Sequence, residues 1–139
     1  MRQVTHILQV RTPGRGLLEI TNEIRDWLNR QATVTGLLTA FCRHTSASLL
    51  IQENAAPEVR SDLEAFFAAM APEESGRYAH EDEGPDDMPA HLRTALTGVQ
   101  LTIPVLDGQL ALGTWQGIYL FEHRQRAHER EVALHLLAD

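Results

Sequence analysis

The sequence predicts an α+β fold in which mixed or antiparallel β-sheets are flanked by two or three helices. Strand-like alternation opens the chain and dominates it after residue 99, whereas helical periodicity is confined to segments between these regions. The chain has neither a regular βαβ series nor a glycine-rich dinucleotide fingerprint, which argues against a doubly wound parallel fold. With 139 residues and 43% hydrophobic content, we expect one domain spanning residues 1–139.

Three strands are expected in the first part of the chain. Residues 3–10 alternate between apolar and polar side chains, which suits a strand with one face on the core. A Pro-Gly pair then turns the chain. Continuous apolar runs predict buried strands at 36–43 and 49–51. The earlier of these two strands would present Arg43 and His44 at its carboxyl end.

Three helices are expected. Thr21 is placed to cap a helix that runs to about Gln31 and carries its apolar residues on one face. Pro57 suits a first helical turn, and the helix behind it carries an apolar stripe that we expect to pack on the core. Pro89 can begin a short third helix that stops before Gly98.

The remaining strands are expected after residue 99. They are predicted at 101–105, 109–112, 116–123 and 131–137. Asp107-Gly108 separates the first two and is typical of a tight β-hairpin. Residues 72–88, in contrast, show no periodicity and are rich in acidic side chains. A loop of this length in a compact domain usually has a functional or flexible role.

Composition excludes several classes of protein. The net charge of −7 argues against a duplex nucleic-acid binder, which needs clustered cations to neutralise phosphates. All twelve basic residues are arginine, so Schiff-base chemistry and a Walker-type lysine are absent. The single cysteine, Cys42, precludes an intrachain disulfide and a cysteine-rich zinc site, and we expect it in the core. Without a bilayer-length apolar run or a signal-peptide core, we expect a soluble cytoplasmic protein with no membrane partner.

Three histidines suggest a metal site. His80 lies in the acidic segment, His91 on the short helix, and His123 at the end of a predicted strand. Histidines from three elements can converge on a divalent ion, zinc first among them, and leave a position open for water or substrate. The alternative is that each histidine makes separate hydrogen bonds.

Carboxylates near these histidines are further candidates. Five carboxylates could bind the ion directly or orient an imidazole: Asp82, Glu83, Asp86, Asp87 and Glu122. Two simpler interpretations stay open. Asp87 could cap the helix that begins near Pro89, and the acidic segment as a whole could be a solvated loop.

Two other motifs have a composition that suits ligand binding. Residues 43–48 combine a guanidinium, an imidazole and hydroxyls, as in a cradle for a small anion or phosphate, although such hydroxyls often bond only to the local backbone. Residues 113–117 place Trp115 and Gln116 between glycines. This arrangement could stack a flat heteroaromatic ligand, or it could be a tight bulge with a buried tryptophan.

These motifs resemble the YjbQ-like family, small proteins described as secondary thiamine-phosphate synthases. The resemblance extends over nearly the whole chain and rests on three motifs in the family's order. They are His44-Thr45-Ser46-Ala47-Ser48 with Glu53-Asn54, Glu83-Gly84 with Asp86-Asp87-Met88-Pro89 and His91, and Gly113-Thr114-Trp115-Gln116-Gly117-Ile118 with Glu122-His123-Arg124.

The resemblance implies an α+β fold, a homotrimer, a metal site built from histidines, and an activity that joins a thiazole phosphate to a hydroxymethylpyrimidine diphosphate. On this basis each candidate residue is given a role. The metal ligands are expected to be His80, His91 and His123, and the acid/base groups His44 and Glu122. Substrate and its phosphate are expected to contact Arg43, Thr45, Ser46, Ser48, Asn54, Trp115, Gln116 and Arg124.

Three functions are compatible with these residues. The first is a metal-dependent transferase with secondary thiamine-phosphate synthase activity. The second is a hydrolase or other enzyme acting on a different phosphorylated metabolite. The third is a non-catalytic trimer that binds a metal or metabolite, with the histidines serving structure. Turnover of a substrate would separate the first two from the third.

Overall fold

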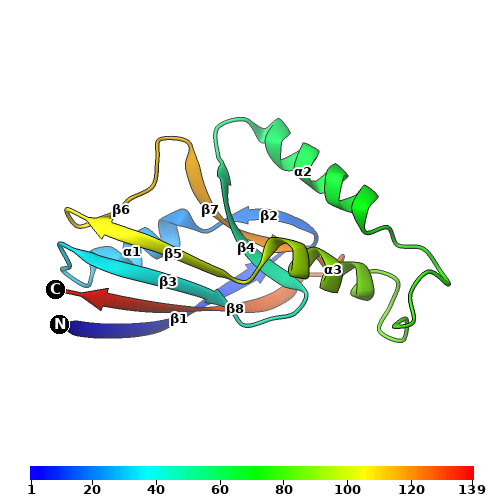
Figure 1. The fold of residues 1–139 in the computed structure, drawn as a ribbon, viewed down its shortest axis with the longest axis horizontal. Coiled ribbons are helices and arrows are strands. Elements are labelled where there is room, and N and C mark those ends of the chain that lie inside the picture. The colour runs from blue at the N-terminus through cyan, green and yellow to red at the C-terminus, as the bar shows by residue number, and fades with distance from the viewer.

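The computed structural model describes residues 1–139, which form two antiparallel sheets and three helices (Figure 1). The strands are β1 (Arg2–Thr12), β2 (Gly16–Glu19), β3 (Gly36–Cys42), β4 (Ala47–Glu53), β5 (Gln100–Leu106), β6 (Gln109–Leu110), β7 (Gln116–Glu122) and β8 (His128–Ala138). The helices are α1 (Thr21–Asn29), α2 (Pro57–Met70) and α3 (Asp87–Thr97). The predicted α+β class is confirmed.

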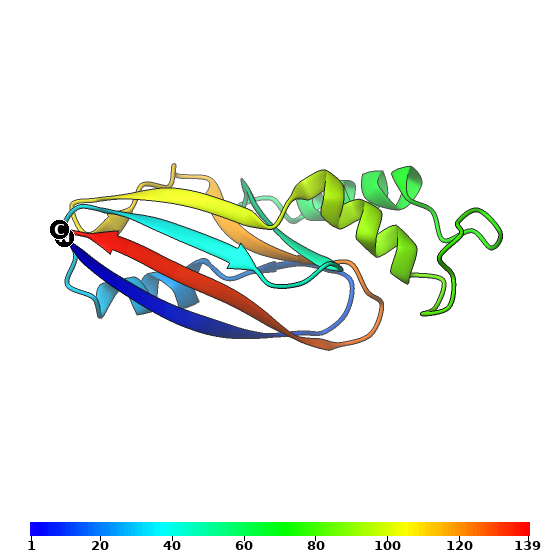
Figure 2. The same ribbon diagram turned by 60° about the horizontal axis from the view of Figure 1, so that its bottom comes forward.

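The eight strands are distributed unevenly between the two sheets. One sheet has five strands in the order β1-β8-β3-β5-β6, and the other has three in the order β2-β7-β4. The long strands β1 and β8 pair antiparallel from Arg2 opposite Ala138 to Thr12 opposite His128. Both termini therefore lie at one end of the molecule, while α3 and the acidic loop before it lie at the other (Figures 1 and 2).

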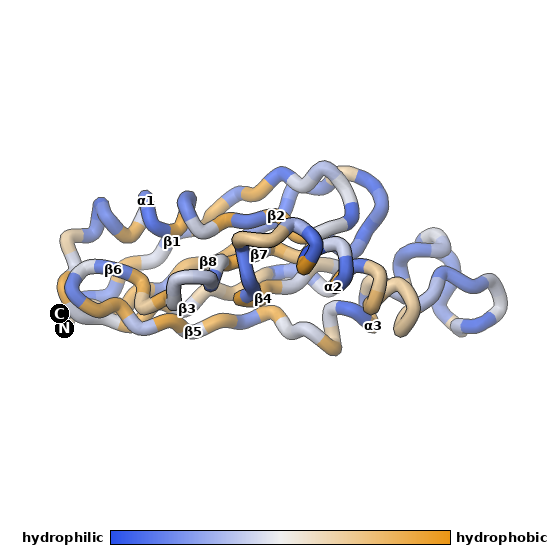
Figure 3. Tube along the Cα trace, turned by 90° about the horizontal axis from the view of Figure 1, so that it is seen from above, coloured by the Kyte–Doolittle hydropathy of each residue, from blue (hydrophilic) through white to orange (hydrophobic).

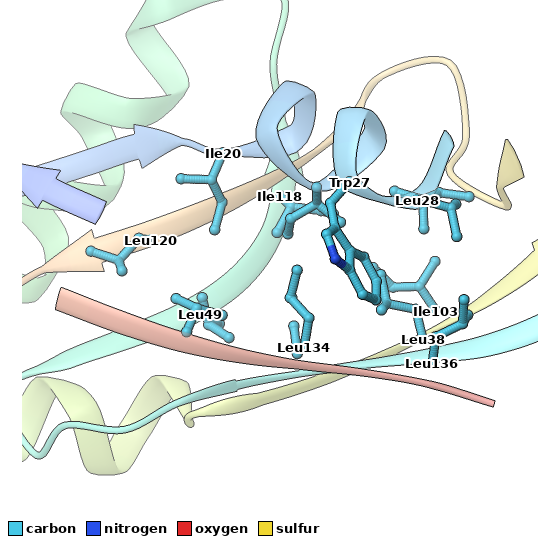
Figure 4. Packing of buried hydrophobic residues seen from close by; sticks show 14 of the residues in the cluster. Ile20, Trp27, Leu28, Leu38, Leu49, Ile103, Ile118, Leu120, Leu134 and Leu136 are labelled. Carbon is cyan, nitrogen blue, oxygen red and sulfur yellow. The ribbon is translucent and has the colours of Figure 1, made fainter. Parts of the chain in front are cut away.

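The hydrophobic core fills the space between the five-stranded sheet and a second layer made of α1 and the three-stranded sheet (Figure 4). Nineteen buried residues form it. Trp27 projects from α1 toward β8, the strand that carries Leu134 and Leu136 (Figure 4). An indole buried in this way contributes a large apolar contact area. The core thus fixes the strands whose far ends carry the candidate site.

Helix α2 packs less tightly than its sequence predicts. None of its residues is fully buried, and Phe66 and Met70 are more than half exposed. The expectation that the whole stripe packs on the core is therefore wrong. Phe67 does contact the protein, with its ring edge-on to Phe121 at 5.6 Å. The loop that follows α2 is mainly hydrophilic (Figure 3).

Most predicted elements are confirmed, with shifted ends. The sequence missed β2, a four-residue strand that directly precedes α1. Thr21 does not cap α1, because the N-cap is Ile20 and the Thr21 hydroxyl instead accepts a hydrogen bond from the Ile118 N–H at 2.8 Å. The Asp107-Gly108 hairpin turn is confirmed, and both residues have positive φ, as a type I′ turn requires.

Helix α3 begins two residues before Pro89. Asp87 is its first residue, and the N-cap position belongs to Asp86, whose side chain makes no capping hydrogen bond. The alternative in which Asp87 caps the helix is therefore wrong. Gly98 ends the helix with φ of 90°, as predicted from its place after the last helical turn. No helix of the chain is long and apolar enough to cross a membrane.

Candidate functional site

Four side chains from the acidic loop and α3 converge at the end of the molecule opposite the termini. They are His80, Glu83, Asp87 and His91, and their ligand atoms all lie within 4.8 Å of one another. Asp87 and His91 share one face of α3, because residues four apart on a helix are neighbours. Two imidazoles and two carboxylates form a donor set that suits zinc and related divalent ions. We call these four residues the His-Asp cluster.

Asp87 lies at the centre of the His-Asp cluster. Its Oδ2 is 2.8 Å from His80 Nε2 and 3.0 Å from His91 Nε2, and Glu83 Oε2 is 3.4 Å from His80 Nε2. Only 3% of the Asp87 side chain is exposed, against 41% of His80. Burial alone would raise the pKa of Asp87, but hydrogen bonding with His80 and nearby positive charge hold that pKa below its usual value. The same hydrogen bond raises the pKa of His80.

The tautomer of His91 is set by the backbone. Its Nδ1 lies 2.8 Å from the carbonyl oxygen of Thr45, which can only accept, so Nδ1 carries the hydrogen. In the neutral ring, Nε2 then holds a lone pair that faces the carboxylate of Asp87 at 3.0 Å. Two acceptors at this separation require a proton or a cation beside them. Metal-binding histidines commonly donate their other N–H to a carbonyl in this way.

Arg124 donates hydrogen bonds to both aspartates and to the backbone of Glu83. Its Nη1 donates to Asp87 Oδ1 at 2.7 Å, its Nε donates to Asp86 Oδ2 at 2.9 Å, and its Nη2 donates to the Glu83 carbonyl at 2.9 Å. The backbone N–H of Gln125 also donates to Asp86. Asp86, one of the expected metal partners, thus serves the loop, and the guanidinium expected on phosphate is occupied by carboxylates.

His123 lies outside the His-Asp cluster. It is fully buried, its Nδ1 accepts a hydrogen bond from Arg93 Nε at 3.0 Å, and its Nε2 lies 2.8 Å from Ser48 Oγ. The Thr97 hydroxyl lies 2.6 Å from Ser48 Oγ and donates to the Arg93 carbonyl. Burial and the neighbouring arginines lower the pKa of His123 to about 2, so the ring stays neutral. This network ties α3 to β4 and β7.

Glu122 is also buried, in a second network. Arg130 donates to both of its oxygens, Thr12 donates to Oε1 at 2.7 Å, and the N–H groups of His123 and Arg124 donate to Oε2. Burial would raise the pKa of Glu122, but the hydrogen bonds from Arg130 and Thr12 keep that pKa below its usual value. The carboxylate is saturated with donors and closed to solvent. It anchors the end of β7.

The predicted phosphate cradle is divided by the structure. Arg43, His44 and Thr45 line a groove that they share with His91. Ser46 and Ser48 are buried and point into the two networks, where Ser46 Oγ accepts from Arg130 and Ser48 Oγ contacts His123. The alternative in which these two hydroxyls bond only to the local backbone is therefore wrong, because their partners are side chains from other elements.

Asn54, Trp115 and Gln116 lie at the other end of β7. The register places Gln116 opposite Glu53 and Glu122 opposite Ala47, so about 20 Å of extended strand separates the two ends. Trp115 is 62% exposed, which excludes the buried-bulge alternative. Its carbonyl accepts the N–H of Asn54, and Gln116 Oε1 accepts the N–H of Gly113. Within one chain these residues do not meet the His-Asp cluster.

Two buried arginines were missed from the sequence. Arg130 alternates in step with Val132 and Leu134 on the core face of β8, so period-two alternation marks it as an inward charge. Arg93 lies on the buried side of α3 with Ala90. In both cases a charged residue at a core-facing position was the available signal, and such charges are almost always paired.

Comparison with known proteins identifies the family of this chain. Residues 6–139 match the family model described as UPF0047 protein YjbQ-like. The chain belongs to this family. A UPF0047 protein of Synechocystis is 52% identical to this YjbQ-like chain over 135 residues, which cover 97% of the chain and 92% of the relative. YjbQ of Salmonella typhimurium is 47% identical over 119 residues, covering 85% and 86%.

The fold agrees with a solved structure of similar length. The crystal structure of the conserved hypothetical protein TT1486 from Thermus thermophilus matches this YjbQ-like chain with a TM-score of 0.85 and 37% identity. The match covers 95% of the chain and 99% of the Thermus protein. The predicted YjbQ-like resemblance is thus confirmed at the level of family and fold. Neither the family description nor the names of these relatives state a reaction.

Proposed function

We propose that the protein is a divalent-cation-dependent enzyme acting on a small phosphorylated metabolite, and that the His-Asp cluster holds the cation, with zinc as the expected ion. The observation that carries this proposal is the lone pair of His91 Nε2, which faces the Asp87 carboxylate because Thr45 fixes the tautomer. A divalent ion beside Asp87 Oδ2 would satisfy both acceptors and also reach His80 and Glu83.

The surroundings of the His-Asp cluster support a catalytic use. When bound, the cation would supply Lewis-acid stabilisation of negative charge on a phosphate or a leaving group. His91 also lines the groove that contains Arg43 and His44. A ligand in the groove would therefore lie beside the cation, with a guanidinium and an imidazole available for its anionic oxygens.

For the specific reaction, we propose transfer between a hydroxymethylpyrimidine diphosphate and a thiazole phosphate, as the family resemblance implies. The cluster and the arginine would offset the charge of the departing diphosphate while the thiazole nitrogen attacks the pyrimidine methylene. A hydrolase acting on another phosphorylated metabolite would use the same groups with water as the nucleophile. The two functions differ in their products, which are thiamine phosphate and diphosphate in the first case and a dephosphorylated alcohol and inorganic phosphate in the second.

Metal content and turnover measured together test the proposal. Wild type, His91→Ala and the control His135→Ala, which changes a histidine on β8 that bonds Gln3, are loaded with zinc, desalted and analysed for metal. Each is then assayed for thiamine phosphate, for diphosphate release and for inorganic phosphate release from phosphorylated substrates, with and without chelator. We expect about one zinc per chain and chelator-sensitive turnover in wild type and His135→Ala, and neither in His91→Ala.

The outcomes separate the three functions. Zinc binding with thiamine phosphate formation supports the transferase, and zinc-dependent release of phosphate without it supports a hydrolase. Stoichiometric zinc with no turnover of any phosphorylated substrate points to the non-catalytic binding protein. A wild type that retains no divalent ion overturns the proposal, and the histidines then act as hydrogen-bonding groups.

We also propose that the chain forms the homotrimer implied by the resemblance. The outer face of the five-stranded sheet is not covered by a helix (Figure 2). Ile7 and Phe41 flank Ala133 in register there, and Ile7, Leu37 and Phe41 are each more than a third exposed. Such an apolar face supports self-association. Light scattering should give three times the chain mass of 15.6 kDa for wild type and a lower mass for Leu37→Glu. A monomeric wild type would contradict the trimer.

A further inference from the structure

One residue of the His-Asp cluster, His80, belongs to a segment that is attached to the rest of the protein by few contacts. Asp87 and His91 lie on α3, and the backbone of Glu83 is hydrogen-bonded to β7 and its following turn. His80 instead lies in the loop after α2, and both this loop and α2 lie outside the two sheets (Figures 1 and 2). We call residues 57–82, which comprise α2 and the first part of the acidic loop, the strap, and the remaining residues the body.

Helix α2 is held to the body with little apolar burial. None of its residues is fully buried, and Val59, Leu63 and Phe67 are half-buried. The Phe67 ring lies edge-on to Phe121 of the body at 5.6 Å. Helices α1 and α3, in contrast, bury four and five residues. Because helices in proteins are stabilised mainly by packing, α2 is the helix that should open most easily.

The other attachments of the strap are polar. Arg60 Nη1 donates to the Tyr119 hydroxyl at 3.1 Å, and Glu64 accepts a hydrogen bond from Arg93 on α3. Glu73, just after α2, accepts from two further side chains of the body. These bonds place the strap against α3 and β7. They can be exchanged for bonds to water when the strap opens, so their net contribution is modest.

The loop part of the strap links α2 to His80. The Tyr78 hydroxyl donates to the Pro72 carbonyl at 2.8 Å, and Glu81 Oε1 accepts the backbone N–H of Gly76 at 2.6 Å. These contacts join the loop to itself rather than to the body, so we expect α2 and His80 to move together. A cation held by His80 and by α3 would therefore fix the whole strap in place.

The closed strap also forms a small pocket beside the His-Asp cluster. The pocket has a volume of about 170 Å³ and is lined by Tyr78 and His80 from the strap and by Met88 and Pro89 from α3, among others. Because its walls come from both sides, opening of the strap would separate them. The His80 side of the cluster would then be open to solvent.

We infer that the strap is a cation-controlled cover, which closes against α3 when an ion joins His80 to Asp87 and His91 and loosens when the ion leaves. This role rests on the proposed function, because the ion is the one assigned to the His-Asp cluster. It goes further by making α2, which carries no cation ligand, part of the response to the ion. Linkage then requires that a change that loosens α2 also weakens cation binding.

Hydrogen exchange followed by mass spectrometry measures opening of the strap. Wild type and His91→Ala, which lacks a cation ligand, are compared with and without zinc at about 100 times the wild-type dissociation constant. If opening releases the ion, zinc at this concentration lowers the open population about 100-fold. In wild type we expect zinc to slow exchange at least about tenfold in both α2 and residues 73–82. Exchange in β8 should not change over the same labelling times, and His91→Ala should not respond to zinc.

Phe67→Ala tests whether α2 and the cation are linked. The change removes the ring that contacts Phe121 but alters no residue of the His-Asp cluster. If it lowers the closed fraction of the zinc-free protein to about a tenth, zinc binds about tenfold more weakly. Phe66→Ala removes the same ring from a position on α2 that is more than half exposed, and its zinc affinity should stay within about twofold of wild type.

Arg60→Met is a milder second variant, because it removes only the bond from α2 to the Tyr119 hydroxyl. It should weaken zinc binding about threefold. If Phe67→Ala does not fold, as judged by exchange in β8, the comparison with Phe66→Ala is made with Arg60→Met instead.

Two results would overturn the strap. One is unchanged exchange of α2 in a wild type that binds zinc, and the other is equal zinc affinity of Phe66→Ala and the folded variant that loosens α2. Zinc titration of the same samples separates this inference from the proposed function. A wild type that takes up no zinc overturns the proposed function and cation control together, whereas zinc uptake without a response of α2 overturns the strap alone.

Discussion

Arg124 donates from Nη1 to Asp87 Oδ1 at 2.7 Å, while the other oxygen of the same carboxylate faces His80 and His91. The two oxygens of Asp87 therefore have different partners. Arg124 fixes the rotation of the carboxylate by bonding at the same time to Asp86 and to the Glu83 carbonyl. The arginine acts on the His-Asp cluster through Asp87, so it is a positioning residue for the proposed cation.

Arg124→Gln is expected to weaken zinc binding without removing a zinc ligand. The glutamine cannot reproduce the three simultaneous contacts, so Asp87 gains rotational freedom and the acidic loop loosens. Loss of an orienting partner of this kind typically lowers metal affinity about 10–100-fold. Competition titration with a zinc indicator measures the change directly.

Arg77→Gln is the matched control. Arg77 lies in the same acidic loop but pairs only with Glu74 at the surface, and both side chains are more than half exposed. Its removal should leave zinc affinity within about twofold of wild type, since exposed pairs contribute little. Equal zinc affinities of Arg124→Gln and Arg77→Gln would show that Arg124 does not position Asp87 for the cation.

Chelation is expected to lower the melting temperature of wild type but not of His91→Ala. A ligand that binds only the folded state stabilises it by about 2.7 kcal/mol at 100 times its dissociation constant. For a domain of this size that corresponds to a shift of several degrees. Scanning fluorimetry with and without chelator gives the comparison. A wild-type melting temperature that does not respond to zinc or chelator would argue against a bound ion.

Acid should destabilise the fold through His123. Its folded pKa of about 2 lies far below the unfolded value near 6.5, so below that value the unfolded chain binds the additional proton. The stability that the neutral ring contributes is complete above pH 6.5 and is lost progressively as pH falls toward the folded pKa. Between pH 7.5 and pH 5 the loss from this one residue is about 2 kcal/mol.

His123→Gln tests this dependence, because the amide can accept from Arg93 and donate to Ser48 without titrating. Urea unfolding at the two pH values should show that the variant loses about 2 kcal/mol less than wild type, since all other groups are common to both. The variant should also retain zinc, because His123 lies outside the His-Asp cluster. Identical pH dependence in the two proteins, or loss of zinc, would contradict this placement.

The sequence predicts the fold well where periodicity or turn chemistry is strong. Alternation located β1 and β8, the apolar run located β3, and Asp107-Gly108 located the hairpin. Prediction from sequence fails where tertiary contacts determine the local structure. The strand β2 has only four residues and is stabilised by pairing with β7. Likewise, threonine is a residue type that favours helix N-caps, but the Thr21 hydroxyl accepts a hydrogen bond from the backbone of β7.

The candidate site was likewise predicted only where local sequence patterns determine it. His80, His91 and Asp87 lie close together in sequence and meet through a loop and one helix turn, so local spacing is informative. His123 and Glu122 have equally suitable chemistry, but their environments depend on Arg93 and Arg130, which arrive from other elements. Residue type alone cannot distinguish an exposed ligand from a buried acceptor that is already satisfied.

Glu122→Gln should act mainly on stability. The change leaves Arg130 buried with a neutral partner, and breaking a buried ion pair costs about 3–5 kcal/mol. Urea unfolding should show a loss of this size, whereas Glu129→Gln, which breaks the exposed pair with Arg11, should cost less than about 1 kcal/mol. Adding Arg130→Met to Glu122→Gln should recover part of the loss, because the uncompensated charge is then absent. If Glu122→Gln instead unfolds like wild type and loses turnover with zinc still bound, the carboxylate acts on substrate, as the sequence first suggested.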